Sequence, residues 1–216
     1  FMLLGILNSQ AAGGVSVENI MFGQGNQANQ FNGVQADSSG NIFAAGRNGI
    51  VIKMDQNGQL LWAKKLENVW WRDCKLDASG NLIVIGYDAG NLGVIAKYGP
   101  TGTLLLQKTI QYHALEEMTF GNTTSDIFVA GFNSTASRNF VGKFAANLSS
   151  FAFTRYNNTN IGGISSIAYY NNSIFMPGYY YSGGFRSTMV SFNDSGGTTN
   201  QKYTTGDNSG NTLAQI

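Results

Sequence analysis

A ten-residue stretch recurs along this chain, and its period limits the fold more than any other feature. Residues 37–46 read DSSGNIFAAG and residues 77–86 read DASGNLIVIG. Weaker copies are NTTSDIFVAG at 122–131 and YNNSIFMPG at 170–178. The glycines that end the four copies are Gly46, Gly86, Gly131 and Gly178, at intervals of 40, 45 and 47 residues. A period of this length indicates an array of equivalent structural units.

A second, unrelated stretch follows each copy of the first. It reads IVIKMDQNGQLLWAKKL (50–66), VIAKYGPTGTLLLQKTI (94–110), FVGKFAANLSSFAFTRY (140–156) and MVSFNDSGGTTNQKYT (189–204). Lys53, Lys97 and Lys143 share one position of it, where the fourth copy has Ser191. Two patterns that recur in the same order with the same period indicate a true repeat rather than chance.

The repeat predicts four short antiparallel strands in each unit. An apolar segment such as 31–36 or 71–76 supplies the first strand, and the ten-residue stretch supplies the second. The longer stretch supplies a hairpin that turns at DQNG or GPTG. Asp caps backbone N–H groups in such turns, and Gly or Asn adopts the positive φ that they require. Four strands in roughly 40 to 50 residues, repeated, are typical of a β-propeller blade.

We therefore expect an all-β fold, a β-propeller of four-stranded antiparallel blades, that forms a single domain over residues 1–216. Four full blades are expected at about 31–68, 69–112, 113–157 and 158–205. Residues 1–30 match the outer hairpin of a partial blade, and residues 206–216 match the start of a closing one. A split fifth blade would lack one strand, which suggests a piece of a longer protein.

The segment DSSGNIFAAGRNGIVIKMDQNGQLLW resembles the bacterial and phage β-propeller repeats of the seven-bladed-propeller-repeat and NHL-like kind. Their pattern has D-x-x-G-N, an apolar strand ending in Gly, an apolar residue before Lys, D-x-x-G and an aromatic residue. Later blades depart from it, since Asn122 and Asp126 replace its Asp and Asn, and Pro177 is expected to interrupt a strand. The resemblance implies binding or structural roles more often than catalysis.

Composition narrows the classes of partner. Charged residues make up 12% of the chain, about half the usual share, so Asn, Ser, Thr, Gln and Gly must supply the polar surface. The net charge is +1 without a basic run, which argues against nucleic-acid binding, and no segment is long enough to insert into a membrane. We expect an extracellular, envelope or virion module without a cofactor. Its partner would be a protein or a surface glycan, or it would assemble into a larger complex.

The recurring acids have two interpretations. Asp37, Asp55, Asp77 and Asp194 could be calcium ligands, but each loop holds one such carboxylate, and capping of the local turn is the expected role. Residues 193–199 (NDSGGTT) partly match the Asp box of sialidase-type propellers, which is also a turn remote from catalysis.

Glu116 and Glu117 form the one acidic pair outside this pattern, close to the only histidine, His113. A propeller hydrolase would need two cooperating carboxylates. Adjacent strand residues point to opposite faces, however, so we expect a solvated loop rather than a catalytic pair. Cys74 is the only cysteine and is expected in the core, and one His with one Cys supplies neither a catalytic triad nor a zinc site.

Aromatic residues are the candidate binding residues. The segment 169–185 includes Tyr169, Tyr179 and Tyr181, of which the last two share a strand face. Tyrosine rings beside Asn and Gly suit stacking on sugars, which would make the protein a carbohydrate-binding adhesin. The alternative is packing between blades. Trp70 and Trp71 raise the same question, since one of two adjacent residues can pack while the other is exposed.

Overall fold

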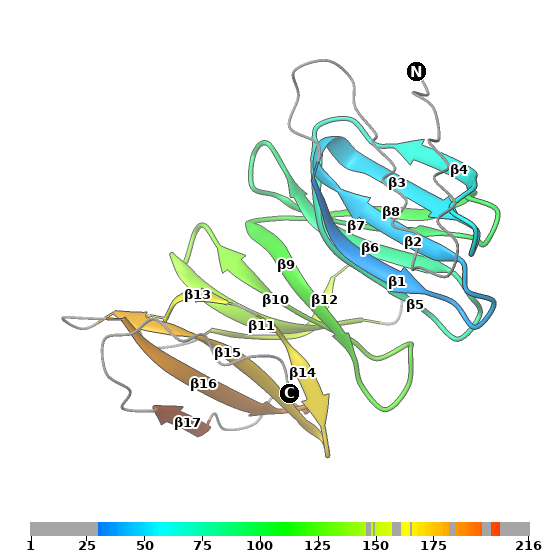
Figure 1. Ribbon diagram of the computed structural model, residues 1–216. Helices are drawn as coiled ribbons and strands as arrows, with labels where there is room; N and C mark the ends of the chain where they lie inside the picture. Colours follow the sequence, from blue (N-terminus) through cyan, green and yellow to red (C-terminus); the bar gives the residue numbers. More distant parts are fainter. Residues whose placement is uncertain are drawn as a thin grey trace.

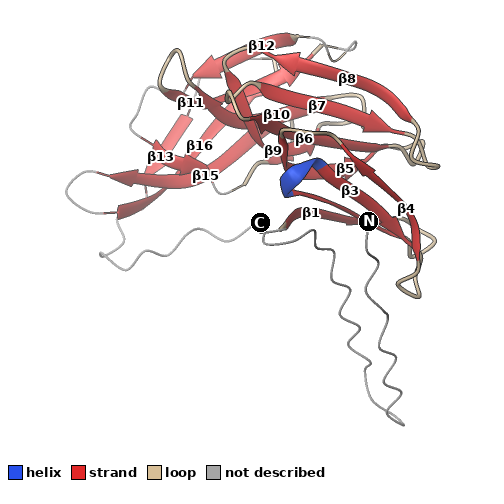
Figure 2. Cartoon of the chain, turned by 90° about the horizontal axis from the view of Figure 1, so that it is seen from above, coloured by secondary structure: helices blue, strands red, loops and turns tan. Residues whose placement is uncertain are grey.

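The computed structural model describes residues 30–203, apart from 146–147, 149, 157–160, 165, 182–184 and 196–199. The regular structure of this part is β-strand, except for one three-residue 3-10 turn, Arg47–Gly49 (η1; Figure 2). The all-β prediction is therefore confirmed. The partial blade expected before residue 30 and the closing segment 206–216 lie outside the described residues, and the single domain stays a prediction.

The strands form four antiparallel sheets in chain order, termed blades 1 to 4 (Figure 1). Blade 1 contains β1 (Phe31–Ala36), β2 (Ile42–Gly46), β3 (Ile50–Met54) and β4 (Leu60–Lys65). Blade 2 contains β5 (Val69–Leu76), β6 (Leu82–Asp88), β7 (Gly93–Tyr98) and β8 (Leu104–Ile110). Blade 3 contains β9 (His113–Phe120), β10 (Ile127–Asn133), β11 (Arg138–Phe144) and β12 (Phe151–Tyr156). Blade 4 contains β13 (Ile161–Ile164), β14 (Ala168–Tyr170), β15 (Ser173–Tyr181), β16 (Phe185–Asn193) and β17 (Asn200–Tyr203).

The first strands of neighbouring blades lie side by side. β1 contacts β5, and β5 contacts β9, whereas β4, β8 and β12 each pair with a single strand at the outer edge of their sheet. Figure 1 shows the four sheets following one another in an arc, with the first strands toward its inside. The blades therefore meet along seams between their first strands.

The apolar cores lie between blades, because each middle strand buries both of its faces. On β6, Leu82 and Val84 belong to a cluster shared with blade 1, whereas Ile83 and Ile85 belong to one shared with blade 3. Strand β10 divides in the same way between blades 2 and 4. Side chains alternate along a strand, so a strand buried on both faces must be apolar throughout, as LIVI and IFVA are.

The repeated aspartates cap their own turns, as expected. Asp37 Oδ1 accepts the N–H groups of Ser39 and Asn41, both at 2.9 Å. The same two bonds recur in three later turns, whose acids are Asp55, Asp77 and Asp88.

The turn at 193–195 differs from this pattern, and the prediction for Asp194 was wrong. Asn193 Oδ1 accepts the N–H of Ser195 at 3.0 Å and so caps the turn. Asp194 Oδ2 instead accepts the hydroxyl of Tyr169 at 2.8 Å. Asn caps such turns as well as Asp does, so the neighbouring Asp is free to face the next element.

Each repeated lysine interacts with a side chain of its own blade, and Lys53 also donates to the Pro100 carbonyl of blade 2 at 3.4 Å. Lys97 Nζ lies 2.7 Å from Asp77 Oδ2 in blade 2, and Lys143 Nζ lies 2.7 Å from Asp126 Oδ1 in blade 3. In blade 1, Lys53 lies over the ring of Phe43, 4.8 Å from its centroid. Burial alone would raise the pKa of Asp77, but Lys97 and hydrogen bonds from the turn lower it below its usual value.

The repeated glycines allow a β-bulge in the first strand of blades 1 to 3. The strand register shifts by one residue at Asn32, Arg72 and Glu116. Gly86 lies opposite the residue before the bulge in blade 2, and a Cβ there would lie 2.0 Å from the carbonyl oxygen of Trp70. The same distance applies at the equivalent glycines, Gly46 and Gly131. A side chain at these positions would thus displace the first strand.

Blade 4 is the irregular blade, but not where the sequence predicted. Strand β15 runs through Pro177, which pairs with Met189, so the expected interruption by Pro177 was wrong. The first strand is divided instead, because β13 ends at Ile164 opposite Gly178, and β14 begins at Ala168 opposite Phe175. The gap faces the proline, which has no N–H group to donate to a continuous ladder.

Candidate functional site

The two residues at each bulge differ in character between blades. They are Asn32–Gly33 in blade 1, Arg72–Asp73 in blade 2, Glu116–Glu117 in blade 3 and Gly162–Gly163 in blade 4. All four blades form the bulge, so the backbone does not require charge there. Charged side chains nevertheless occupy it in the two central blades, whose first strands are in contact. We refer to Arg72, Asp73, Glu116 and Glu117 as the bulge cluster.

Asp73 joins the two strands of this seam. Its Oδ1 accepts the N–H of Cys74 at 2.7 Å, and its Oδ2 accepts the N–H of Met118, on β9, at 3.0 Å. Lys75 Nζ lies 4.0 Å from Oδ2. Burial raises the pKa of Asp73, while Lys75 and the two N–H donors oppose that shift. Asp73 is therefore a positioning residue that fixes β9 against β5.

Glu116 and Glu117 lie on β9 rather than in a solvated loop, so the predicted loop was wrong. The argument that they point to opposite faces was also wrong, because the bulge at Glu116 breaks the alternation of side chains. Arg72 acts electrostatically on both carboxyl groups. The sequence signal that could have located the bulge is the repeated glycine, since Gly131 lies opposite the residue before it.

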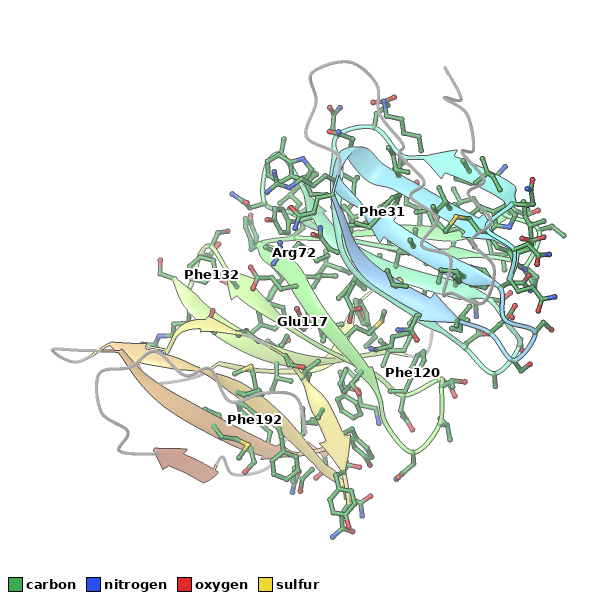
Figure 3. All side chains as sticks on the ribbon, viewed as in Figure 1. Phe31, Arg72, Glu117, Phe120, Phe132 and Phe192 are labelled. Carbon is green, nitrogen blue, oxygen red and sulfur yellow. The ribbon has the colours of Figure 1, made fainter. Side chains whose placement is uncertain are left out.

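The electrostatics of the cluster are dominated by burial. Burial raises the pKa of Glu116, and Arg72 opposes the shift. Burial raises the pKa of Glu117 to about 7, with the charge of Asp73 adding to the effect and Arg72 opposing it. Within the described residues, neither glutamate forms a hydrogen bond or an ion pair, and Arg72 Nε is buried without a hydrogen-bond partner. Arg72 Nε is thus the one atom of the cluster that is buried and unsatisfied within the described residues. Figure 3 labels Arg72 and Glu117 on the first strands of blades 2 and 3.

His113 has a structural role. Its Nδ1 lies 2.6 Å from the carbonyl oxygen of Gln111, to which it donates, and its Nε2 lies 2.9 Å from Asn133 Nδ2, from which it accepts. Its ring also packs edge-on against Phe140 and Phe151. Because both ring nitrogens are engaged, His113 and Glu116 do not form a catalytic pair.

One tryptophan of the adjacent pair is buried and the other is exposed, as the sequence suggested. Trp71 is fully buried in the core between blades 1 and 2, whereas Trp70 is 44% exposed and packs edge-on against Tyr87. Cys74 is buried as predicted, and burial raises the pKa of its thiol to about 12, with the charge of Asp73 adding to the effect. The thiol is therefore protonated and unreactive at neutral pH.

The structure treats the three candidate tyrosines differently. Tyr169 stacks on Phe128 of blade 3 at 5.4 Å, and its hydroxyl donates to Asp194. Burial and that hydrogen bond raise its pKa to about 12. Tyr169 therefore packs between blades 3 and 4 rather than standing free for a ligand. Tyr179 and Tyr181 lie on β15, but their side chains lie outside the described residues.

Two further aromatic residues join Trp70 at the end of the blades where the first strands begin. Tyr112, just before β9, is 55% exposed, and Phe132, near the end of β10, is 41% exposed. We refer to Trp70, Tyr112 and Phe132 as the aromatic rim. Rim and cluster occupy the same two blades, and the first strands lead from one to the other (Figure 3). Sequence reasoning missed Tyr112 and Phe132, although both stand at predicted strand ends.

The described residues offer no alternative site of a familiar kind. No three His, Cys, Asp or Glu side chains come together within them in an arrangement that could hold a metal ion. No helix in the same part of the chain is long and apolar enough to cross a membrane.

Solved structures confirm the fold. The chain is similar to Kuenenia stuttgartiensis hydrazine synthase (TM-score 0.68, 10% identity, covering 80% of this chain and 53% of that one). It is also similar to the Dos1 propeller (0.62, 13%, 82% and 47%) and to the Neurospora crassa Pan2 WD40 domain (0.61, 12%, 79% and 51%). Four blades of a β-propeller are present. The chain spans about half the length of these structures.

Sequence comparison does not assign the chain to a protein family. No model of a known protein family matches the chain, and no curated protein resembles it in sequence. The solved structures thus show the propeller fold, whereas the resemblance to the NHL-like and phage repeats stays a prediction.

Proposed function

We propose that the protein is a non-catalytic binding module that holds a protein partner at the aromatic rim and bulge cluster of blades 2 and 3. One observation carries the proposal: the same bulge forms with Asn–Gly in blade 1 and with Gly–Gly in blade 4. The charged residues at the bulges of blades 2 and 3 are therefore not needed to form the bulge, and binding of a partner would explain their presence.

The side-chain types suit a protein partner. Trp, Tyr and Arg are the residues that most often carry binding energy at protein interfaces, and the rim and cluster hold Trp70, Tyr112 and Arg72. The backbones of Trp70 and Arg72 are fixed in β5, and Tyr112 lies in the turn that leads into β9, so little ordering is needed on binding. Lys75 and Arg72 offset part of the charge of three carboxylates, which favours a partner surface of mixed polarity. The proposal includes the extracellular, envelope or virion location expected from composition.

The test compares two surface aromatics of the intact chain. Trp70→Ala should abolish capture of the partner from the native source, whereas Tyr170→Ala should leave it unchanged. Tyr170 is 74% exposed on β14, in a different blade, so it controls for nonspecific loss of an aromatic side chain. Both variants should unfold at the wild-type denaturant concentration. Equal capture by wild type and Trp70→Ala would refute the proposal.

Glycan binding is the second candidate, because the exposed Trp70 offers a flat apolar surface on which a sugar ring can stack. A glycan array probed with wild type and Trp70→Ala separates it from protein binding. Signal lost only in the variant would favour the adhesin. A hydrolase would instead show turnover on a glycoside panel that Glu117→Gln removes, since Glu117 is the carboxyl with the raised pKa.

A further inference from the structure

The chain contains six Asn-x-Ser/Thr sequons, the sequence that N-linked glycosylation requires, and the structure describes four of them. The asparagines of these four are Asn122, Asn133, Asn171 and Asn193, whereas Asn147 and Asn157 lie outside the described residues. An asparagine that carries a glycan must keep its side-chain amide in solvent, because a branched sugar chain is too bulky for a close-packed interior. The contacts of each amide therefore decide which sequon suits a glycan in the folded chain.

Three of the four asparagines are already engaged by the fold. Asn133 is buried, so a sugar on its amide would prevent folding. Asn122 Nδ2 donates to Asn172 Oδ1, on the next blade, at 3.1 Å. Asn193 Oδ1 accepts the N–H of Ser195 at 3.0 Å and its hydroxyl at 2.7 Å, and Ser195 is the third residue of the same sequon. A glycan at these positions would compete with burial or with a hydrogen bond of the folded chain.

Asn171 differs from the other three. It is exposed, and its side chain forms no hydrogen bond within the described residues. With Asn172 it makes the two-residue turn between β14 and β15, where Tyr170 pairs with Ser173. Both turn residues have positive φ, 46° and 57°, as a tight hairpin of this kind requires. Figure 1 shows this turn at the lower tip of blade 4.

The second residue of the turn, Asn172, makes the contacts that Asn171 lacks. Its Oδ1 accepts from Asn122 Nδ2 at 3.1 Å and from the hydroxyl of Tyr169 at 3.2 Å. Its carbonyl oxygen accepts the N–H of Asp194 at 2.9 Å. The turn is thus fixed through the residue after Asn171, and modification of Asn171 would break none of these bonds.

Tyr170 offers an apolar surface beside this asparagine. It comes directly before Asn171 and is 74% exposed, more than any other exposed large apolar or aromatic side chain in the described part of the chain. The flat face of an aromatic ring suits the CH groups on one side of a sugar ring. The first sugar of a glycan on Asn171 would therefore cover a ring that otherwise stands in water.

We propose that Asn171 is an N-glycan acceptor whose first sugar packs on Tyr170. In the transfer, Asn171 Nδ2 forms a bond to the anomeric carbon of a lipid-linked oligosaccharide. The bond from that carbon to the lipid diphosphate breaks, and the amide proton is lost with this leaving group. The cell supplies the donor and its transferase outside the cytosol, so the proposal rests on the location proposed above and not on the partner.

The proposed glycan would leave the aromatic rim open. The turn at Asn171 lies where the first strand of blade 4 ends, since β14 finishes at Tyr170. The rim lies where the first strands of blades 2 and 3 begin, at Trp70 and Tyr112. Glycosylation and binding of a partner thus use opposite ends of the blades.

Peptide mass spectrometry of the full chain from its native source tests the acceptor. The amidase that releases N-glycans converts the asparagine that carried them to aspartate, so Asn171 should be read as Asp and Asn133 as Asn. In a Ser173→Ala chain from the same cells, which lacks the sequon hydroxyl, Asn171 should stay Asn. An unmodified Asn171 in wild type would overturn the proposal, without bearing on capture of a partner through Trp70.

Urea unfolding tests the packing on Tyr170. Removal of the glycan from wild type should raise the unfolding equilibrium constant by roughly 2-fold to 10-fold, because the contact between sugar and ring is lost. The same removal should have little effect on Tyr170→Ala. In the chain without glycan, Tyr170→Ala should unfold like wild type, since the exposed ring then contributes little. Equal effects of glycan removal on the two chains would overturn the packing.

Discussion

Two neighbouring seams of this molecule have the same backbone arrangement and different side-chain chemistry. Between blades 1 and 2, a bulge with Asn32 and Gly33 meets β5 through a neutral amide and a close backbone approach. Between blades 2 and 3, a bulge with Arg72 and Asp73 meets one with Glu116 and Glu117. Both seams have the glycine opposite the bulge, but only the seam between blades 2 and 3 has charged residues at both of its bulges. Repeats within one chain thus act as controls for each other, separating what the fold needs from what is added.

The largest expected effect tests what the seams share. Gly86→Ala should destabilise the chain by about 3 kcal/mol or more, because the new Cβ would lie 2.0 Å from a backbone oxygen that cannot move without the strand. Gly46→Ala and Gly131→Ala should have similar effects. Gly99→Ala is the matched control, since its Cβ would lie 3.7 Å from the flexible Leu105 side chain and should change stability little. Urea midpoints for the four variants provide the measurement.

The next effect tests what the seams do not share. Asp73→Ala should reduce stability by about 2 kcal/mol, because the buried N–H groups of Cys74 and Met118 lose their acceptor. Asn32→Ala should cost about 1 kcal/mol, since it removes a single donor to the Trp71 carbonyl. Equal losses in the two variants would contradict the distinction between seams.

The smallest effect compares the repeated lysines. Lys97→Met should cost about 1 kcal/mol, because it leaves Asp77 nearly buried without its ammonium partner. Lys53→Met should cost less, since Lys53 has no ion pair: it covers the Phe43 ring and donates one long hydrogen bond, at 3.4 Å, to the Pro100 carbonyl. The lowered pKa of Asp77 means that its contribution exists above its ordinary pKa and is lost as pH falls through the folded value. The difference between the variants should thus shrink in acid, which thermal unfolding at pH 7 and pH 3 would measure.

Local signals made most of the fold predictable from sequence. The turn at Asp37 and the hairpin at 55–58 depend on nearby residues, and period-two burial depends only on the strand itself. Blade 4 was harder, because the effect of Pro177 depended on which neighbouring strand would leave a gap beside it.

The candidate site was less predictable, because it depends on two strands whose joined residues, Asp73 and Met118, are 45 positions apart. The sequence shows Glu116 and Glu117 as a pair, but the alternation of side chains along an ideal strand predicts that they point to opposite faces. The bulge that breaks this alternation arises from strand pairing, which the local sequence does not specify. Asp73 gave no signal of its own, since its role is to accept an N–H from the next blade. Trp70 was predictable as one of two alternatives, and burial of Trp71 decided between them.

The placement of the cores between blades bears on how such a chain can lengthen over generations. Blades 2 and 3 each contribute one face to the core before them and the other face to the core after them. A duplicated blade inserted at a seam would bring both half-cores with it and leave its neighbours' packing intact. Tandem duplication therefore adds a unit without redesign, after which residues at the bulge can diverge while the glycine opposite stays fixed. The likeness of 37–46 and 77–86, which share five of their ten residues, beside the contrast of Gly33 with Asp73, is the record that such growth would leave.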